Sequence, residues 1–282
     1  MNVIAARAQR QTDATPASER SASEASVRDL ALVTSGAMLA LLPPTLLAEA
    51  LDPRGLNGAT LWLKPMHFQL SLALHFWTLA YLTRLLSPPW RRSRWLRATM
   101  LAASLSTMVE TAWLMIQAAR GTASHFNTDT PLEHIIYILM GLAAVGIIGG
   151  AVTFGCAIAR SDGLVRDRQL RRGATLGLIG GGAVTVIVAG TLSAGTSHLV
   201  GGPQTDAFGL PFLGWATRGG DLRVAHFFAT HAMQVLPLAG YLADRTPLTR
   251  AAWLMPALAA LYLALVIAVF VQALMGHPFL AL

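Results

Sequence analysis

The sequence predicts an all-α, polytopic membrane protein, a bundle of about seven transmembrane helices. Its composition is apolar, since 54% of the 282 residues are hydrophobic and only 12% are charged, and its mean hydropathy is +0.52. Long runs with few charges recur along the chain, each near the ~20 residues that a helix needs to cross hydrocarbon. These runs are Leu30–Ala50, Pro65–Leu86, Ala98–Ala119, His134–Ala159, Ala174–Ser197, Val224–Leu242 and Ala251–Met275.

The first 28 residues differ in composition from the rest of the chain. They are rich in Ala, Ser, Thr and Arg, and they lack the apolar centre of a cleavable signal peptide. Such a segment buries too little apolar surface to fold by itself. We therefore predict a disordered cytoplasmic N-terminal tail over residues 1–28 and a seven-span transmembrane domain over residues 29–282.

Arginine sets the expected orientation. The connection from Arg84 to Arg97 holds five arginines and no acid, and the connection from Arg160 to Arg172 holds five arginines and two aspartates. Because cytoplasmic loops carry an excess of Lys and Arg, we expect both connections and the N-terminus to lie inside the cell. The formal charge of +7 then reflects topology and contact with the lipid bilayer, and nucleic acid is not an expected partner.

The second predicted span carries a polar face. Lys64, the only lysine in the chain, is followed by His67, Ser71, His75 and Thr78 at offsets of three, four, four and three residues. Residues at these offsets share one face of a helix. An ionisable side chain at the bilayer centre costs a few kcal/mol, about 3 on insertion scales, unless it faces a partner, a cavity or water. This face is therefore expected to line a polar space.

Two further spans have polar faces, because their polar residues also recur at helical spacing. Glu110, the only acid well inside a predicted span, shares a face of the third span with Thr107 and Gln117, and Thr230 lies on the polar face of the sixth. The three faces lie at comparable depths, so we predict that they meet in one outward-facing site for a small-molecule or ion ligand. The candidate residues are Lys64, His67, His75, Glu110, Gln117, Arg223, His226, His231 and Gln234.

A short internal similarity favours a repeat. The second span begins KPMHFQLS and the sixth begins RVAHFFAT, which share a basic residue, His-Phe and a hydroxyl residue at the same spacing. The following spans end with the similar phrases QAARG and QALMG. Spans one to three and five to seven are then parallel repeats joined by span four, and binding sites of repeat-built transporters lie at the repeat interface.

The phrases LKPMHFQLS, QAARGTASHFN and GDLRVAHFFATHAMQVLPL resemble those of a group of bacterial multi-span membrane proteins to which no activity is assigned. The resemblance covers most of spans two to six and implies a multi-pass protein of the bacterial cytoplasmic (inner) membrane. It marks most of the candidates above and adds four secondary positions in the outer connections, which are Arg120, His125, Asn127 and Asp221.

Three functional hypotheses are open at this point. In the first, which we prefer, the protein is a carrier or channel for a small polar or anionic solute or for protons. Lys64 and Arg223 would attract an anion, His67 and His226 would bind or relay protons, and Glu110 would be a deeper titrating group beside His231. A bundle with no soluble domain has no visible energy source except a gradient or a redox carrier, and the repeat favours a gradient.

In the second hypothesis the protein carries a b-type haem, with His67 and His226 as axial ligands and with Lys64 and Arg223 holding the propionates. In the third it is a metal-dependent membrane hydrolase. Ser71 and His75 are similar to the Ser-x-x-x-His of the seven-span ceramidase and progestin-receptor-like superfamily, in which zinc activates water. This sequence departs from that family because its later histidine pair, on the sixth span, is five residues apart. A transition metal bound without hydrolysis is also open.

Structural interpretations compete with each of these hypotheses. Histidines and glutamines in membrane bundles often serve only as interhelical hydrogen-bond partners. Lys64 can also be an interfacial side chain at a helix start, and Asp221 and Arg223 can be a helix-start acid and an interfacial anchor. The outer segment Phe208–Trp215 is too short to span, so it is either a lid over the site or a simple surface loop.

Overall fold

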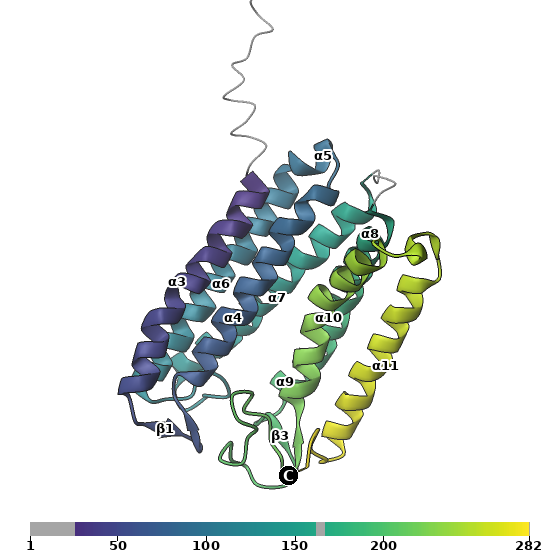
Figure 1. Ribbon diagram of the computed structural model, residues 1–282. Helices are drawn as coiled ribbons and strands as arrows, with labels where there is room; N and C mark the ends of the chain where they lie inside the picture. The colour runs from purple at the N-terminus through teal and green to yellow at the C-terminus, as the bar shows by residue number, and fades with distance from the viewer. Residues whose placement is uncertain (1–25, 162–166, 282) are drawn as a thin grey trace, which may run out of the picture.

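The computed structural model describes residues 26–161 and 167–281, without the side chains of Ser26, Leu248 and Thr249. Long helices dominate this part of the chain and pack as a bundle (Figure 1). They are α3 (Ser26–Leu51), α4 (Leu63–Leu82), α6 (Arg94–Arg120), α7 (Pro131–Ala159), the continuous α8–η3–α9 (Arg168–Thr175, Leu176–Gly181, Gly182–Ala194), α10 (Leu222–Ala243) and α11 (Leu254–Leu274).

Short elements connect the long helices. The 3-10 turn η1 (Thr83–Leu85) and helix α5 (Pro88–Arg91) follow α4, and η4 (Pro247–Arg250) follows α10. Two antiparallel ribbons complete the described chain, and they pair β1 (Gly55–Leu56) with β2 (Ala59–Thr60) and β3 (Leu199–Val200) with β4 (Gly220–Asp221).

The predicted all-α class is confirmed, and each predicted apolar run coincides with one long helix. Five of these helices in the described chain are long and apolar enough to cross a membrane, namely α3, α6, α7, α8–η3–α9 and α11. Helices α4 and α10 are not among the five. They are also the helices with the longest predicted polar faces, so their polar side chains lower the hydropathy on which the criterion depends.

Some predicted boundaries are wrong by a few residues. The tail was expected to end at residue 28, but α3 already begins at Ser26, while residues 1–25 lie outside the described chain. Helix α6 begins at Arg94 because the Ser93 hydroxyl caps it by accepting a hydrogen bond from the amide of Leu96. The second apolar run extends to Leu86, yet α4 ends at Leu82 and gives way to a 3-10 turn.

The two ends of the bundle differ in composition. One end, here called the arginine end, holds the connection 83–93, the end of α7, the start of α8 and the turn after α10, and it lies at the top of Figure 1. The opposite end, here called the ribbon end, holds both β-ribbons, the 121–130 connection and the C-terminal residues (Figure 1). Helices α4 and α10 run in the same direction, each from the ribbon end to the arginine end.

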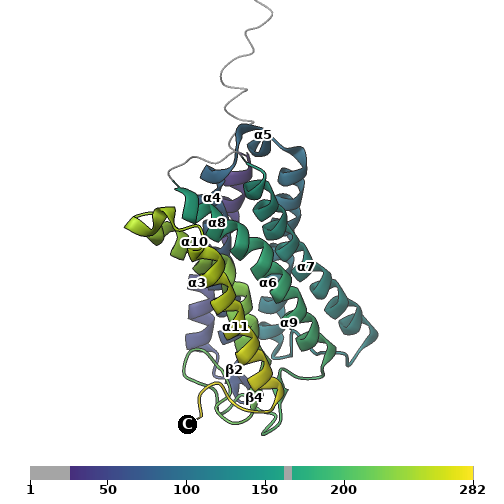
Figure 2. The ribbon, with the colours of Figure 1, turned by 90° about the vertical axis from the view of Figure 1, so that its right-hand side faces the viewer.

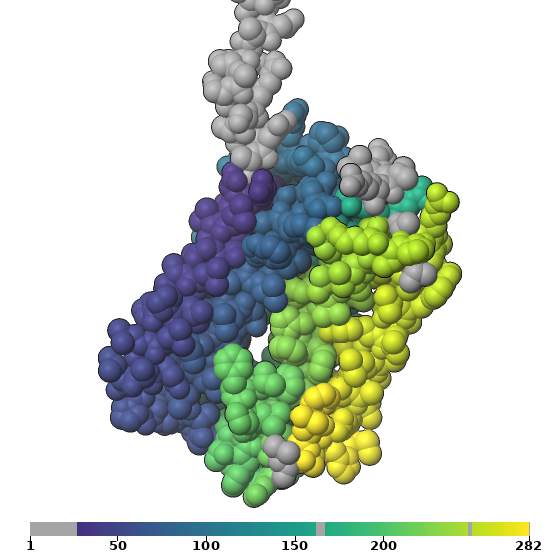
Figure 3. All heavy atoms as spheres, viewed as in Figure 1, coloured from purple at the N-terminus to yellow at the C-terminus, as the bar shows by residue number. Residues whose placement is uncertain are grey.

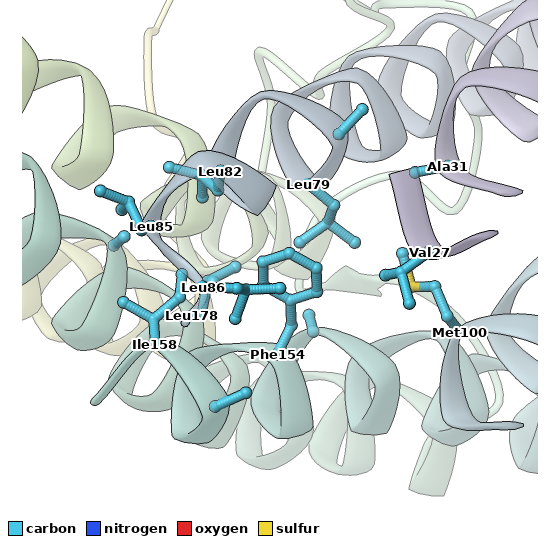
Figure 4. Packing of buried hydrophobic residues seen from close by; sticks show 14 of the residues in the cluster. Val27, Ala31, Leu79, Leu82, Leu85, Leu86, Met100, Phe154, Ile158 and Leu178 are labelled. Carbon is cyan, nitrogen blue, oxygen red and sulfur yellow. The ribbon is translucent and has the colours of Figure 1, made fainter. Parts of the chain in front are cut away.

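The main hydrophobic core lies in the half of the bundle nearest the arginine end (Figure 4). Leu79 and Leu82 of α4, Phe154 and Ile158 of α7, and Leu178 of η3 belong to this core, and each is almost inaccessible to solvent. Many large apolar side chains of α7 and α11 instead point outward and are exposed. Because a water-soluble protein rarely exposes such a continuous apolar surface, a lipid bilayer is its expected surroundings.

Glycines fix α10 against the α8–η3–α9 helix. A Cβ on Gly240 of α10 would overlap the carbonyl oxygen of Gln169, and a Cβ on Gly177 would lie 2.7 Å from the carbonyl oxygen of Ala232. The crossing therefore depends on residues without side chains. Helix α9 contacts both α10 and α7, and α11 packs along α10 on another side (Figure 2).

Candidate functional site

Helices α4 and α10 face each other across the centre of the bundle, and side chains rather than close backbone packing join them. The side-chain amide of Gln234 on α10 donates a hydrogen bond to Nδ1 of His75 on α4, with the two nitrogens 3.3 Å apart. His75 is buried. Because Nδ1 accepts this bond, the ring proton of the neutral imidazole lies on Nε2.

Several buried polar atoms on α4, α6 and α10 have no hydrogen-bond partner in the described chain. They are Nε2 of His75, Oε1 of Gln234, Nδ1 of His226, Oγ1 of Thr230 and, on α6, Oγ1 of Thr107. Leaving one such atom unpaired in an apolar interior costs about 1–3 kcal/mol. Because these unpaired atoms lie on helices whose polar sides face one another, we expect them to contact water or a ligand.

The space-filling view is consistent with this expectation. An opening lies between the blue surface of α4 and the green surface of α10, on the ribbon-end side of the core (Figure 3). We call the space between the polar faces of α4, α6 and α10 the polar cleft. Toward the arginine end it meets the hydrophobic core, to which Phe76 and Leu79 of α4 and Met233 of α10 contribute.

Lys64 and His125 lie at the ribbon end of the cleft. The Lys64 ammonium is 3.2 Å from Nδ1 of His125, and the Ser124 hydroxyl is 3.2 Å from the same nitrogen. The His125 ring contacts two aromatic rings, those of Phe68 on α4 and Tyr137 on α7. Burial holds the pKa of His125 well below its usual range, and electrostatic interaction with Lys64 and His226 lowers it further, so this imidazole is neutral.

The other predicted residues form a continuous set of neighbours. Lys64 lies within electrostatic range of buried Glu110 on α6, and His125 lies within range of His226. His231 in turn interacts with both His226 and His75. Its ring also contacts the tilted ring of Phe227, with centroids 4.2 Å apart, and it lies beside Gln234 without a well-aligned hydrogen bond.

Arg223 is held in a network of its own. Its guanidinium pairs with Asp206 at 2.7 Å and with Asp221 at 2.8 Å, and it donates to the carbonyl oxygen of Gly214. Buried Asp221 caps α10 by accepting a hydrogen bond from the Arg223 amide. His198 lies 3.0 Å from the same Asp206 carboxylate. The two carboxylates balance the Arg223 charge, so this residue is poorly placed to attract an anion.

The same network anchors a long loop between β3 and β4. Residues 201–219, here called the 201–219 loop, leave and return through the β3–β4 ribbon. The loop reaches across to the β1–β2 turn, where the Asp206 amide and the Thr205 hydroxyl both donate to the carbonyl oxygen of Asn57. Burial raises the pKa of Asp206, but the hydrogen bond from His198 and the charge of Arg223 outweigh it and hold the pKa below its usual range.

His67 contacts this loop. Its Nε2 lies 2.6 Å from the carbonyl oxygen of Phe212, and the two rings meet edge to face. A carbonyl oxygen can only accept a hydrogen bond, so Nε2 carries the proton. In this conformation Nε2 of His67 is not available to an iron atom. Axial ligation of a haem by His67 would therefore need its Nδ1 or a break in this hydrogen bond.

The remaining candidates shape the connection after α6. Gln117 donates to the carbonyl oxygen of Ala123 and accepts from Arg120, which also lies 3.7 Å from Glu133. Asn127 likewise donates to Ala123. These contacts hold the loop that carries His125. Gln117, Arg120 and Asn127 thus support the site from outside the cleft.

The described residues contain no group of three or more His, Cys, Asp or Glu side chains placed to hold one metal ion. A structural or catalytic zinc ion needs at least three protein ligands. The proposed pairing of Ser71 and His75 with a histidine pair on α10 does not form such a group in residues 26–161 and 167–281. This arrangement therefore gives the hydrolase hypothesis no support.

Sequence reasoning gave no role to Asp206, His198 or Asn57, although these residues fix the 201–219 loop. Their contacts join connections as far as 149 residues apart in the chain, and no helical periodicity marks them. The Asn57-Gly58 pair was the available signal, because both residues have positive φ and this dipeptide favours tight hairpin turns.

Comparison with known proteins gives no match to a family, to a characterised protein or to a solved structure. The two resemblances noted from the sequence therefore stay predictions, and the functional argument depends on the site itself.

Proposed function

We propose that this protein is a carrier of the bacterial cytoplasmic membrane that takes up a small polar solute, together with protons, from the polar cleft. The observation that carries the proposal is the set of unpartnered buried polar atoms on α4, α6 and α10, since such atoms need water or a ligand. Imidazole, carboxyl, hydroxyl and amide groups can both bind a polar solute and exchange protons with it.

The proposal includes seven membrane spans. Helices α4 and α10 have 20 and 22 residues, which is enough to cross hydrocarbon, and their polar faces point inward where lipid does not reach them. The excess of arginine at one end favours a cytoplasmic location for that end and for the N-terminus. The ribbon end would then face outward, and the cleft would open to the outside.

The order of elements supports the proposed parallel repeat. Helix α4 follows α3 through the β1–β2 ribbon and continues into α6, and α10 follows α9 through the β3–β4 ribbon and continues into α11. Helix α7 lies between these two units in the chain. The cleft between α4 and α10 would then lie at the interface of two repeats, as in other carriers built this way.

Access to the cleft would alternate between the two ends. The hydrophobic core of α4, α7, η3 and α10 closes the arginine end in this conformation, and the 201–219 loop covers part of the ribbon end. Transport would require the core to separate. The π-helical turn η3 and Pro237 of α10 lie in contact at this level, and both are irregularities at which helices bend.

Proteoliposomes with a luminal pH-sensitive dye test this function. External sugars, polyols, amino acids, carboxylates and amides are added in turn, and the change in luminal pH is recorded. At least one class is expected to change the pH with the wild type and with His134→Gln, a control at an exposed position on α7, but not with His226→Gln. The carrier proposal fails if no class does so, or if His226→Gln behaves like the wild type.

An optical spectrum of the purified protein separates the carrier from the haem hypothesis. A carrier is expected to be colourless. A Soret band that shifts on reduction and disappears in His226→Ala would instead make the protein an electron-transfer protein.

A further inference from the structure

The ribbon end of the cleft presents hydrogen-bond donors that are not used up. The ammonium of Lys64 has three protons, and in the described chain its one hydrogen bond goes to Nδ1 of His125. An ammonium can only donate, so Nδ1 must accept, and the proton of the neutral His125 ring must lie on Nε2. No partner for this N–H is present among the described residues. Because Nδ1 and Nε2 lie on opposite sides of the imidazole ring, this N–H points away from the ammonium, and the donors left at the mouth of the cleft are the two further protons of Lys64.

The positive charge of Lys64 is also not neutralised by a contact with a carboxylate in the described part of the chain. No ion pair of Lys64 with a carboxylate occurs within residues 26–161 and 167–281, although Glu110 and Asp206 lie within electrostatic range. Arg223, by contrast, is paired with both Asp206 and Asp221. Of these two cations, Lys64 is thus the one left for an external anion. Its side chain is exposed to solvent, as a binding group at the mouth of a cleft must be.

Building on the proposed function, we infer that the solute is a small carboxylate whose carboxyl group binds the Lys64 ammonium beside His125. The carboxylate oxygens accept the ammonium protons that His125 does not take, and hydrogen bonds between charged partners are about twice as strong as neutral ones. The aromatic rings of Phe68 and Tyr137, which both contact His125, fit an apolar substituent on that carboxylate.

Charge balance assigns a partner role to Glu110. When the solute carboxylate enters, one proton from the outer solution binds the ionised Glu110 carboxylate and converts it to the neutral acid. The loaded site then holds the Lys64 cation, the solute anion and neutral Glu110, so its net charge equals that of the empty site with Lys64 and ionised Glu110. No redox step and no further reactant is needed.

Calorimetric titration of the purified protein tests the inference. The probes are acetate, lactate and benzoate, each compared with its neutral amide. We expect at least one of the acids to bind, its amide to bind far more weakly, and Lys64→Gln to weaken binding of the acid by about tenfold or more. Lys64→Arg should retain much of the affinity. Arg218→Gln, which removes an exposed cation from the 201–219 loop, should bind the acid like the wild type.

Two results would overturn the inference. If the amides bind as tightly as the acids, or if Lys64→Gln binds the acid normally, the carboxylate does not bind at Lys64, although the carrier proposal survives. If none of the six probes binds while another solute class moves protons in proteoliposomes, the assignment of the solute is wrong and the carrier stands. Unchanged unfolding temperatures of the ligand-free variants exclude misfolding as the cause of lost binding.

Discussion

His75 of α4 and Gln234 of α10 are joined by a hydrogen bond although they are 159 residues apart in the chain. The bond links the two halves of the bundle at the level where the polar cleft meets the hydrophobic core. Each partner keeps one unpaired atom, Nε2 of His75 and Oε1 of Gln234. The pair thus keeps one unused donor and one unused acceptor, which suits a ligand with both kinds of group.

Gln234→Leu should separate function from stability. Interhelical hydrogen bonds in membrane proteins contribute about 0.6 kcal/mol on average, so the unfolding temperature should change little. Solute-driven proton movement in proteoliposomes should be lost, because the variant removes an acceptor from the cleft and a partner from His75. Val235→Leu changes the adjacent, outward-facing residue and should leave both properties unchanged. Normal proton movement in Gln234→Leu would remove this pair from the site.

Glu110→Gln should abolish solute-driven proton movement while the protein still folds. The amide has nearly the shape of the carboxyl group but does not take up or release a proton near neutral pH. Glu133→Gln is the matched control, because a glutamine at this position can still accept the hydrogen bond of the Thr130 hydroxyl at the start of α7. The measurement is luminal pH beside thermal unfolding of the same preparations. Full proton movement in Glu110→Gln would rule out this carboxyl group as the proton site.

The 201–219 loop should loosen in acid. The pKa of Asp206 lies below its usual value, so its pairing stabilises the fold above the ordinary carboxylate pKa of about 4 and is lost as the pH falls through the lower folded value. Asp206→Asn should therefore imitate acid at neutral pH. We expect hydrogen exchange in peptides from residues 201–219 to be about tenfold faster or more.

Exposed Asp129 supplies the control for this experiment. Asp129→Asn removes one carboxylate at the same end of the bundle without touching the loop, so its exchange should match that of the wild type. Equal exchange in Asp206→Asn and the wild type at pH 7 would mean that the ion pairs with Arg223 and His198 do not hold the loop.

Gly240→Ala should destabilise the protein by about 1–3 kcal/mol, the usual cost of overpacking. The added methyl group would overlap the backbone of Gln169 and Leu170, which cannot move aside as a flexible side chain could. Gly190→Ala in α9 is the control, because a Cβ there meets nothing within 4 Å. Thermal unfolding in detergent should show a lower midpoint for the first variant alone. Equal midpoints would place the close contact of α10 with α8 in doubt.

Cysteine labelling tests the proposed orientation. Cys156 is the only cysteine in the sequence, so Cys156→Ser gives a background for single cysteines. Exposed Thr128 at the ribbon end and exposed Arg94 at the arginine end serve as the two labelling positions. In intact cells an impermeant maleimide should react with Thr128→Cys, and with Arg94→Cys only after the membrane is permeabilised. The reverse pattern would show that the cleft opens to the cytoplasm.

The long helices could be predicted from the sequence because apolar length determines a membrane-spanning segment. The meeting of His75 and Gln234 could be anticipated as well, since periodicity places polar side chains on one face of a helix and the cost of exposing them to lipid turns that face inward. Neither apolar length nor helical periodicity determines the distances between the helices.

The loop contacts could not be predicted in this way. Asp206 reaches Arg223 and Asn57 through folds of the chain that no periodic pattern encodes, and His67 bonds to a backbone oxygen, which no side-chain pattern reveals. Arg223 was consequently expected to attract an anion, although its proximity to Asp221 in the sequence already indicated a local partner.

The central claim is that the unpaired atoms of the polar cleft bind a solute. An electron cryo-microscopy map of the protein in lipid nanodiscs, with the transported solute added, tests it most directly. We predict density of the solute or of ordered water in contact with Nε2 of His75, Nδ1 of His226 and Oε1 of Gln234, absent or altered without solute. Lipid chains filling the cleft, or these atoms bonded to one another in both maps, would contradict the account.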